Sequence, residues 1–168
     1  MPTPVTIRPA TPADIPTIAT LADVIWRQHY PAIISMAQID YMLAQRYNPA
    51  ALQHQISGPD QWLDLALADE QVVGFTQYYR NGPGEMKLDK LYLLPDLHGQ
   101  GLGSQLLQHV VAQAQARQCT TLILAVNKHN AKAIAAYTRN GFSVRDSVTV
   151  DIGQGYLMDD FVMVKNIG

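Results

Sequence analysis

The spacing of hydrophobic residues changes along the chain, and the change separates a helical first third from a strand-rich middle. Apolar residues between Ile15 and Ile25 recur every three or four positions, which predicts an amphipathic helix. A short β-branched stretch at 5–8 predicts a strand before it. Two more helices are expected after Ser35 and Asn48, because both residue types cap helices and both precede apolar residues at helical spacing. The first third is therefore expected to be mostly helical.

The middle of the chain changes to a shorter period, as expected for strands. Three runs rich in apolar, β-branched and aromatic residues are separated by polar or glycine-rich turn clusters. Together they predict a three-stranded antiparallel meander. The predicted strands are 62–67, 72–79 and 86–94.

Helical and strand patterns follow one another after the meander. The sequence contains no internal repeat, low-complexity segment or linker, so we predict a single α/β domain over residues 1–168 with a mixed sheet. The elements predicted in this half are helices over 101–117 and 130–140 and strands over 121–126, 142–150 and 156–164.

Composition narrows the function classes. The 168 residues are 48% hydrophobic and 15% charged with a net charge of −2, which fits a globular domain and gives no indication of nucleic-acid binding. Cys119 is the single cysteine, so an internal disulfide is excluded and a reducing compartment is favoured. No apolar run is long enough to cross a membrane, and the first ten residues lack the apolar core of a secretion signal. We therefore expect a cytoplasmic protein that binds neither nucleic acid nor membrane.

Three glycines at alternating positions, Gly99, Gly101 and Gly103, lie between a predicted strand and a predicted helix. A helix N-terminus presents free N–H groups and partial positive charge to a phosphate, and glycine removes the side chains that would keep a phosphate away. A tight turn with close strand–helix packing is the alternative, but the alternation favours a pyrophosphate site. The dinucleotide fingerprint G-x-G-x-x-G does not fit, because its third glycine falls on Ser104 or Leu106, and the Gly-Lys-Ser/Thr of a triphosphate loop is absent.

The stretch from Leu91 to Gly103 resembles the acetyl-CoA motif of the GNAT superfamily of N-acetyltransferases. The family pattern is Arg/Gln-x-x-Gly-x-Gly/Ala, and this chain has His98 where Arg or Gln is usual. A second block, from Asn127 to Phe142, resembles the family's N-x-x-A and Y-x-x-x-G-F segment at the right distance. The resemblance implies an α/β (α+β) fold of one domain, with a mixed, mostly antiparallel central sheet flanked by helices.

The resemblance also implies where acetyl-CoA, the co-substrate, would bind. The strands around Leu93 and Ile123 would splay to admit the pantetheine arm, the backbone of Leu91 and Leu93 would pair with the arm, and amides of 99–104 would hold the pyrophosphate. Asn130 would contact the arm, although it is equally a good helix N-cap. The implied cofactor-binding residues are Leu91, Leu93, His98, Gly99, Gln100, Gly101, Leu102, Gly103, Ser104, Asn130 and Tyr137.

Acetyl transfer to an amine requires a base, because an alkyl ammonium has a pKa of about 10.4 and must lose a proton. Asp89, where many relatives place a carboxylate, is the predicted base, helped by burial that raises its pKa. The alternatives are an exposed charge beside neighbouring lysines, a base role for a water, and Glu85 as a weaker base. The resemblance implies that Tyr137 donates a proton to the leaving thiolate, the alternative being an aromatic that only packs.

The acetyl acceptor is expected to contact the N-terminal helices and the last strands. Trp26, Tyr30 and the acidic stretch 151–160, which includes Asp159, resemble the bacterial polyamine (spermidine/spermine) acetyltransferase branch. Aromatic and acidic groups suit a polycation, so we predict a small primary amine such as a polyamine. The five histidines lack metal-ligand spacing, so no metal is expected, and a homodimer is considered. The alternative functions are a non-catalytic acyl-CoA-binding or regulatory module and a nucleotide-dependent enzyme.

Overall fold

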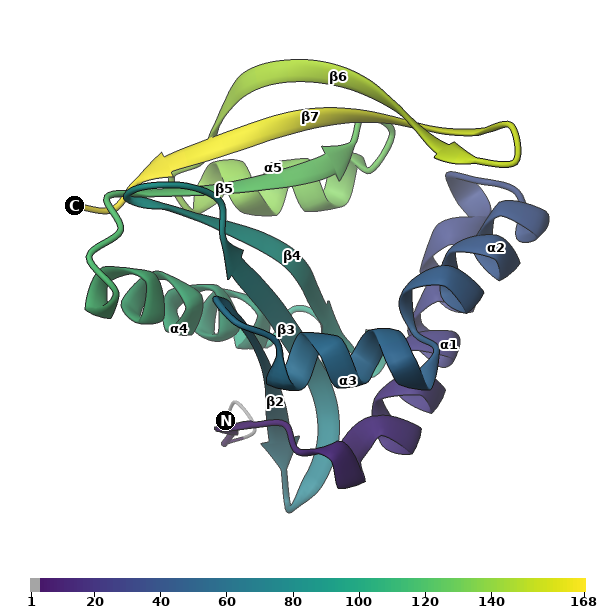
Figure 1. Cartoon of the computed structure of the whole chain (residues 1–168), viewed down its shortest axis with the longest axis horizontal. Helices are drawn as coiled ribbons and strands as arrows, with labels where there is room; N and C mark the ends of the chain where they lie inside the picture. Colours follow the sequence, from purple (N-terminus) through teal and green to yellow (C-terminus); the bar gives the residue numbers. More distant parts are fainter. Residues whose placement is uncertain (1–3) are drawn as a thin grey trace.

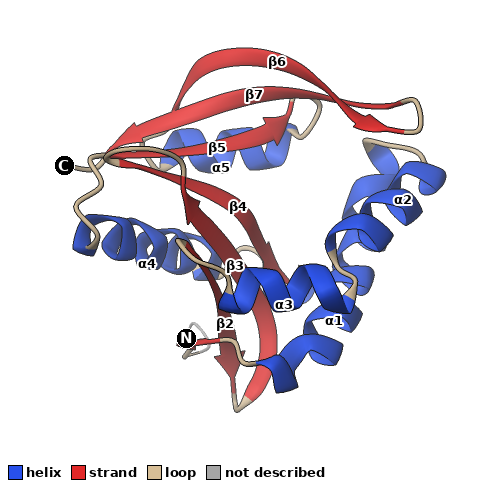
Figure 2. Cartoon of the chain, in the orientation of Figure 1, coloured by secondary structure: helices blue, strands red, loops and turns tan. Residues whose placement is uncertain are grey.

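A seven-stranded sheet forms the centre of the computed structural model, which describes residues 4–168 (Figures 1 and 2). The strand order is β1-β2-β3-β4-β5-β7-β6, and every neighbouring pair is antiparallel except β4 and β5, which are parallel. The predicted mixed, mostly antiparallel sheet is confirmed. The strands are β1 (Thr6–Pro9), β2 (Gln61–Ala68), β3 (Gln71–Arg80), β4 (Glu85–Leu93), β5 (Thr121–Asn127), β6 (Ser143–Gly153) and β7 (Tyr156–Asn166). Residues 1–3, part of the segment expected to lack a secretion signal, lie outside the described range.

Helices cover both faces of this sheet. The helices are α1 (Ile15–His29), α2 (Met36–Arg46), α3 (Pro49–Ser57), α4 (Leu102–Ala116) and α5 (Ala131–Arg139). The first three pack their apolar residues with Leu63, Leu65 and Phe75 on one face, whereas α4 and α5 pack with Leu88 and Leu124 on the other. Figure 1 shows α1, α2 and α3 gathered on one side of the strands and α4 on the other. Within residues 4–168, no helix is both long and apolar enough to cross a membrane.

The predicted capping residues begin their helices. The hydroxyl oxygen of Ser35 accepts a hydrogen bond from the backbone N–H of Gln38 at 3.1 Å, at the start of α2. The amide oxygen of Asn48 accepts from the N–H of Ala51 at 2.8 Å, at the start of α3. These bonds satisfy N–H groups that have no partner inside the helix. The observed helix starts therefore follow from local side-chain chemistry.

The parallel pair β4–β5 opens partway along its length. Pairing joins only Glu85–Leu88 to Thr121–Leu124, after which the strands separate. At the same place the register between β3 and β4 shifts by one residue, which makes Asp89 an extra residue in β4. Such a bulge bends its strand and increases its twist. The predicted splay is confirmed at Leu93, but Ile123 and Leu124 still pair, so the opening in β5 begins at Ala125.

The long hairpin of β6 and β7 reaches across to α2, as Figure 1 shows. The hydroxyl of Tyr41 donates to the carbonyl oxygen of Ile152 at 2.6 Å, and its ring packs on Tyr156 with centroids 5.1 Å apart. The amide of Gln38 donates to the carbonyl oxygen of Leu157 at 3.1 Å. These contacts tie the hairpin tip to α2 and close one end of the space between the sheet and the N-terminal helices.

Candidate active site

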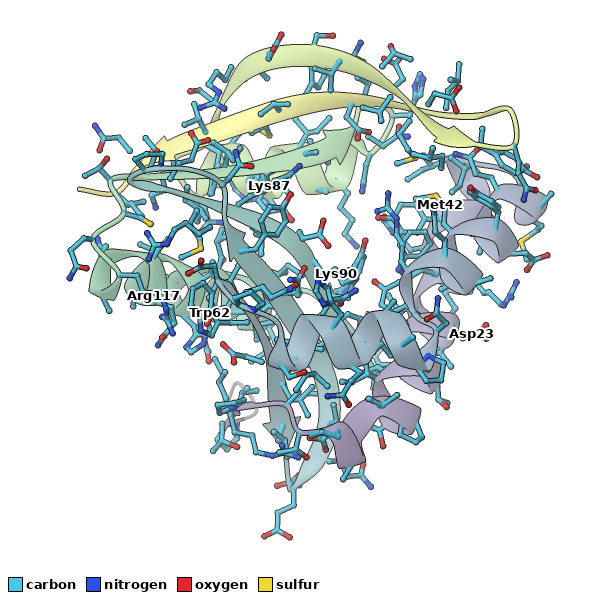
Figure 3. The ribbon with its side chains drawn as sticks, viewed as in Figure 1. Asp23, Met42, Trp62, Lys87, Lys90 and Arg117 are labelled. Carbon is cyan, nitrogen blue, oxygen red and sulfur yellow. The ribbon has the colours of Figure 1, made fainter. Side chains whose placement is uncertain are left out.

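One cavity of about 810 Å³ occupies the opening between β4 and β5 and extends to the N-terminal helices. Lys90 from β4 and Met42 from α2 line it from opposite sides, and both are labelled in Figure 3. Most of the predicted site residues share this cavity although they come from distant parts of the chain. The predicted residues in its lining are Trp26, Tyr30, Asp89, Leu91, Leu93, His98, Gly99, Gly101, Gly103, Ser104, Asn130 and Tyr137. Gln100, Leu102 and Asp159 are outside the lining, and Leu102 is a core residue.

The glycine loop borders open space. Gly99 and Gly101 have φ angles of +83° and +78°, and no atom lies within 4 Å of the position that a Cβ would take at either residue. Gly101 is the N-cap of α4, so the N–H groups of the first turn have no partner inside the helix. Left-handed backbone, free space and unpaired donors are the properties of a phosphate-binding loop.

His98 links this loop to the end of β4 and to α5. Its Nε2 lies 3.2 Å from the carbonyl oxygen of Leu93, and its Nδ1 lies 3.5 Å from Nζ of Lys132. A lysine ammonium only donates, so Nδ1 accepts and the proton on Nε2 is donated to the Leu93 carbonyl. A cation from α5 thus lies beside His98, which stands where the resembled motif has Arg or Gln. The sequence reasoning missed Lys132, because only the packing of α5 brings it to His98.

Tyr137 lies in the cavity lining on α5. Its ring packs against Phe142 with centroids 5.7 Å apart at 64°, so the packing alternative is present together with the cavity position. Burial, followed by the nearby phenol of Tyr30, raises the pKa of Tyr137 above its ordinary value of 10.0. The phenol therefore keeps its proton at neutral pH and can donate it.

Asp89 and Lys90 form an ion pair at the bulge of β4. The two side chains are 2.8 Å apart, with 30% of Asp89 and 5% of Lys90 exposed. Burial acts to raise the pKa of Asp89, but the charge and hydrogen bond of Lys90, together with Arg46 and Lys87, outweigh it and the pKa is lowered. The expectation of a raised pKa at Asp89 is therefore wrong, although burial acts in the expected direction. Asp89 is held as an ionised partner of Lys90, which makes it a weak base.

Asp160 is the carboxylate of the last strands that lines the cavity. It is 8% exposed, and its buried Oδ1 has no hydrogen-bond partner among the described residues. Burial raises its pKa, against the opposing charges of Arg46 and Lys87. The predicted Asp159 lies outside the lining and pairs with Lys128 at 2.7 Å. Successive strand residues face opposite sides, so the acidic stretch reaches the cavity through Asp160 and not through its neighbour.

An aromatic wall closes the cavity toward α1. The rings of Trp26 and Tyr30 lie with centroids 4.5 Å apart, and the hydroxyls of Tyr30 and Tyr92 are 3.0 Å apart. Trp26 also packs against Tyr47, with centroids 5.9 Å apart. Trp26 and Tyr30 were predicted from the sequence, whereas Tyr47 and Tyr92 join them only through folding. In the described part of the chain, no three His, Cys, Asp or Glu side chains gather as a metal site would require.

The chain is similar in sequence to known acetyltransferases. The sequence profile described as "Acetyltransferase (GNAT) family" matches residues 21–142. An uncharacterised N-acetyltransferase of Mycobacterium tuberculosis is 27% identical over 137 residues, which cover 82% of this chain and 87% of the relative. A spermidine N(1)-acetyltransferase of Thermoplasma acidophilum is 26% identical over 145 residues, which cover 84% and 89%.

A crystal structure shows the same fold over nearly the whole chain. The PaiA N-acetyltransferase of Thermoplasma acidophilum, solved in complex with coenzyme A, superimposes with a TM-score of 0.85 at 25% sequence identity. The match covers 97% of this chain and 99% of the other.

Proposed function

The chain belongs to the GNAT family of acetyltransferases, and from that premise we propose that it transfers the acetyl group of acetyl-CoA to the primary amine of a small molecule. The observation that carries the proposal is the single cavity that joins the glycine loop to Tyr137 and Asp160. A cofactor site, a proton donor and a carboxylate therefore open into one space. The reaction needs these three groups together.

The loop residues are proposed to hold the diphosphate of acetyl-CoA through backbone N–H groups from Gly99 to Ser104. Support comes from the open space at Gly99 and Gly101 and from the similar protein solved with coenzyme A. Lys132 would add a positive charge beside His98. The pantetheine arm would enter where β4 and β5 separate, with Leu91 and Leu93 as its backbone partners, and Asn130 stays a predicted contact. The oxygen of Asn130 already accepts from the N–H of Ala133 at 3.4 Å, so its helix-capping role is observed.

Direct transfer uses one proton acceptor and one proton donor. Asp160 is proposed to take the proton of the acceptor ammonium, since its raised pKa makes it a better base than Asp89. The neutral amine nitrogen then forms a bond to the thioester carbonyl carbon, and the carbon–sulfur bond breaks. Tyr137 donates its proton to the departing thiolate. The acylated nitrogen loses its second proton, which restores the phenol of Tyr137, and Asp160 releases its proton to solvent. The products are an N-acetylated amine and the free thiol of coenzyme A.

A polyamine is the finer expectation for the acceptor, and the spermidine N(1)-acetyltransferase relative supports it. The aromatic wall of Trp26 and Tyr30 also suits an alkyl ammonium. Of the acids predicted to bind a polycation, however, Asp159 is paired outside the cavity and only Asp160 lines it.

Thiol release measured with acetyl-CoA and a panel of polyamines, amino acids, aminoglycosides and peptide N-termini tests the proposed activity. At least one amine is expected to release free thiol with an acetylated product of matching mass. The non-catalytic module would bind acetyl-CoA in calorimetry and release no thiol with any amine, which would refute the proposal.

The lone cysteine also supports a reducing, cytoplasmic setting, because Cys119 is free and buried. A single domain over residues 1–168 is part of the same proposal. The homodimer considered from the sequence stays a prediction that light scattering in solution decides.

Gly101→Ala is expected to weaken acetyl-CoA binding at least about tenfold, because the new Cβ enters the space proposed for the diphosphate. Gly155 is a matched control, with a φ of +82°, no atom within 4 Å of its Cβ position and a place outside the cavity lining. Both alanine variants should lose about 1–2 kcal/mol of stability from left-handed strain. Isothermal calorimetry measures the affinities; equal affinities in the two variants would remove the diphosphate assignment.

Tyr137→Phe is expected to lower kcat about 10²- to 10⁴-fold while leaving acetyl-CoA affinity near the wild-type value, because only the proton donor is lost. Tyr156→Phe removes a hydroxyl outside the cavity lining and should leave kcat unchanged. Steady-state kinetics with the best amine of the panel provide the measurement. Wild-type turnover in Tyr137→Phe would reject its role as acid.

Asp160→Asn is expected to lower kcat/KM about 10²- to 10⁴-fold by removing the base. In the wild type, kcat/KM should fall as the pH drops through the raised pKa of Asp160, because protonation blocks the base. This acidic limb should be missing from the residual activity of the variant. Asp159→Asn, next in the chain but outside the cavity, is the control. It should keep the acidic limb and near-wild-type kcat/KM at neutral pH, with the limb moved to lower pH because the charge of Asp159 helps to raise the pKa of Asp160. A larger loss in Asp89→Asn than in Asp160→Asn would move the base to Asp89.

A further inference from the structure

The acceptor end of the cavity contains more cations than a polyamine site needs. The charged lining residues outside the glycine loop and α5 are Arg46, Lys87, Asp89, Lys90 and Asp160. Asp89 and Lys90 neutralise each other in an ion pair at 2.8 Å. Arg46 and Lys87 remain, opposite the single carboxylate of Asp160. A chain of ammonium groups would meet net positive charge here.

Arg46 has no partner of its own in this set. It is the last residue of α2, is partly buried and lines the cavity, yet its guanidinium makes no ion pair or hydrogen bond with any described residue. Arg27 shows the contrast on the neighbouring helix, where Asp23 and Asp40 both bind its guanidinium at 2.9 and 2.8 Å. Lys87 likewise forms no direct ion pair with a described carboxylate, although its charge acts on Asp89 and Asp160, and its ammonium lies 5.9 Å from the ring centroid of Tyr79.

An unpaired arginine in a cavity with an aromatic wall is suited to a planar anion. The guanidinium presents paired N–H donors whose spacing matches a carboxylate, and it is more weakly hydrated than an ammonium. Removal of water from the cavity strengthens such a bond. Asp160 carries the complementary charge for an amine in the same lining.

We propose that the acceptor is an amine that also carries a carboxylate, with its ammonium toward Asp160 and its carboxylate toward Arg46. The inference rests on the proposed function, because it names the substrate class of that acceptor site. Lys87 adds positive charge beside the same group. The acceptor would therefore be amino-acid-like.

Pairs of amines that differ only by the carboxylate test the proposal directly. Lysine and cadaverine form one such pair, and alanine and ethylamine form another. Calorimetry on the wild-type protein saturated with coenzyme A should give at least about tenfold tighter binding of the carboxylate member in one or both pairs. Equal or tighter binding of both decarboxylated members would overturn the proposal, as would the absence of binding by lysine and by alanine.

The Arg46→Gln variant tests whether Arg46 causes the preference for amines that carry a carboxylate. The binding ratio within the preferred pair should fall at least about tenfold, and Arg46→Lys should keep part of it. Arg139→Gln removes an arginine from α5 in the same cavity lining and is the charge-matched control, in which the ratio should stay at the wild-type value. A ratio that Arg46→Gln leaves unchanged would overturn the assignment, since an arginine that only stabilises the end of α2 would not affect the choice of ligand.

Thiol release separates this inference from the proposed function. A carboxylate preference in binding without thiol release from any amine would refute the acetyl transfer and leave the anion site. Thiol release with cadaverine and ethylamine but no carboxylate preference would refute the anion site and leave the acetyl transfer.

Discussion

The parallel pairing of β4 with β5 is the constraint on which the site depends, because it holds for four residues and then stops. Up to Leu88 and Leu124 the two strands form one continuous sheet with a closed core on the α4 and α5 side. Beyond that point each strand keeps only its antiparallel neighbour. The backbone edges of β4 and β5 that are exposed there border the cavity. The same sheet therefore holds the site residues in place and forms the opening between them.

Some charged side chains in the opening between β4 and β5 form ion pairs, and others have no partner among the described residues. Lys90 is almost fully buried, with its ammonium 5.3 Å from the ring centroid of Tyr47, and Asp89 satisfies its charge. Asp89, the base predicted from the sequence, is therefore held in an ion pair. Asp160 has one buried oxygen without a partner among the described residues, and its pKa is raised, so it is the carboxylate better suited to accept a proton. The unpaired Arg46 is left in the same way for an anion.

The sequence predicted those parts of the structure that local chemistry determines. Serine and asparagine are preferred at helix N-termini, so the caps Ser35 and Asn48 could be predicted from the residues that follow them. Two motifs at the family's spacing predicted the glycine loop and the position of Tyr137. Asp160 was part of the predicted acidic stretch but was not identified as the base, and Arg46 and Lys132 were missed. Their proposed roles depend on strand facing and on helix packing across distant segments. In the acidic stretch, the side of β7 that each carboxylate faces depends on register, which a sequence with adjacent aspartates does not specify. The pKa of Asp89 was predicted in the wrong direction, because the sequence showed the neighbouring lysines only as exposed charges and not that Lys90 is buried in an ion pair with Asp89.

The extra residue in β4 connects the cofactor end of the cavity to the acceptor end. Before the bulge, Leu88 packs toward α4, so uninterrupted alternation would also turn Lys90 and Tyr92 toward α4. Because Asp89 adds one residue, Lys90 instead faces Tyr47, and Tyr92 joins the aromatic wall on the α1 side. The same shift turns Leu91 toward the α4 side. One inserted position thus bends the strand away from β5 and sets which side chains line the cavity. The slot proposed for the pantetheine arm and the wall proposed for the acceptor therefore arise from a single backbone irregularity.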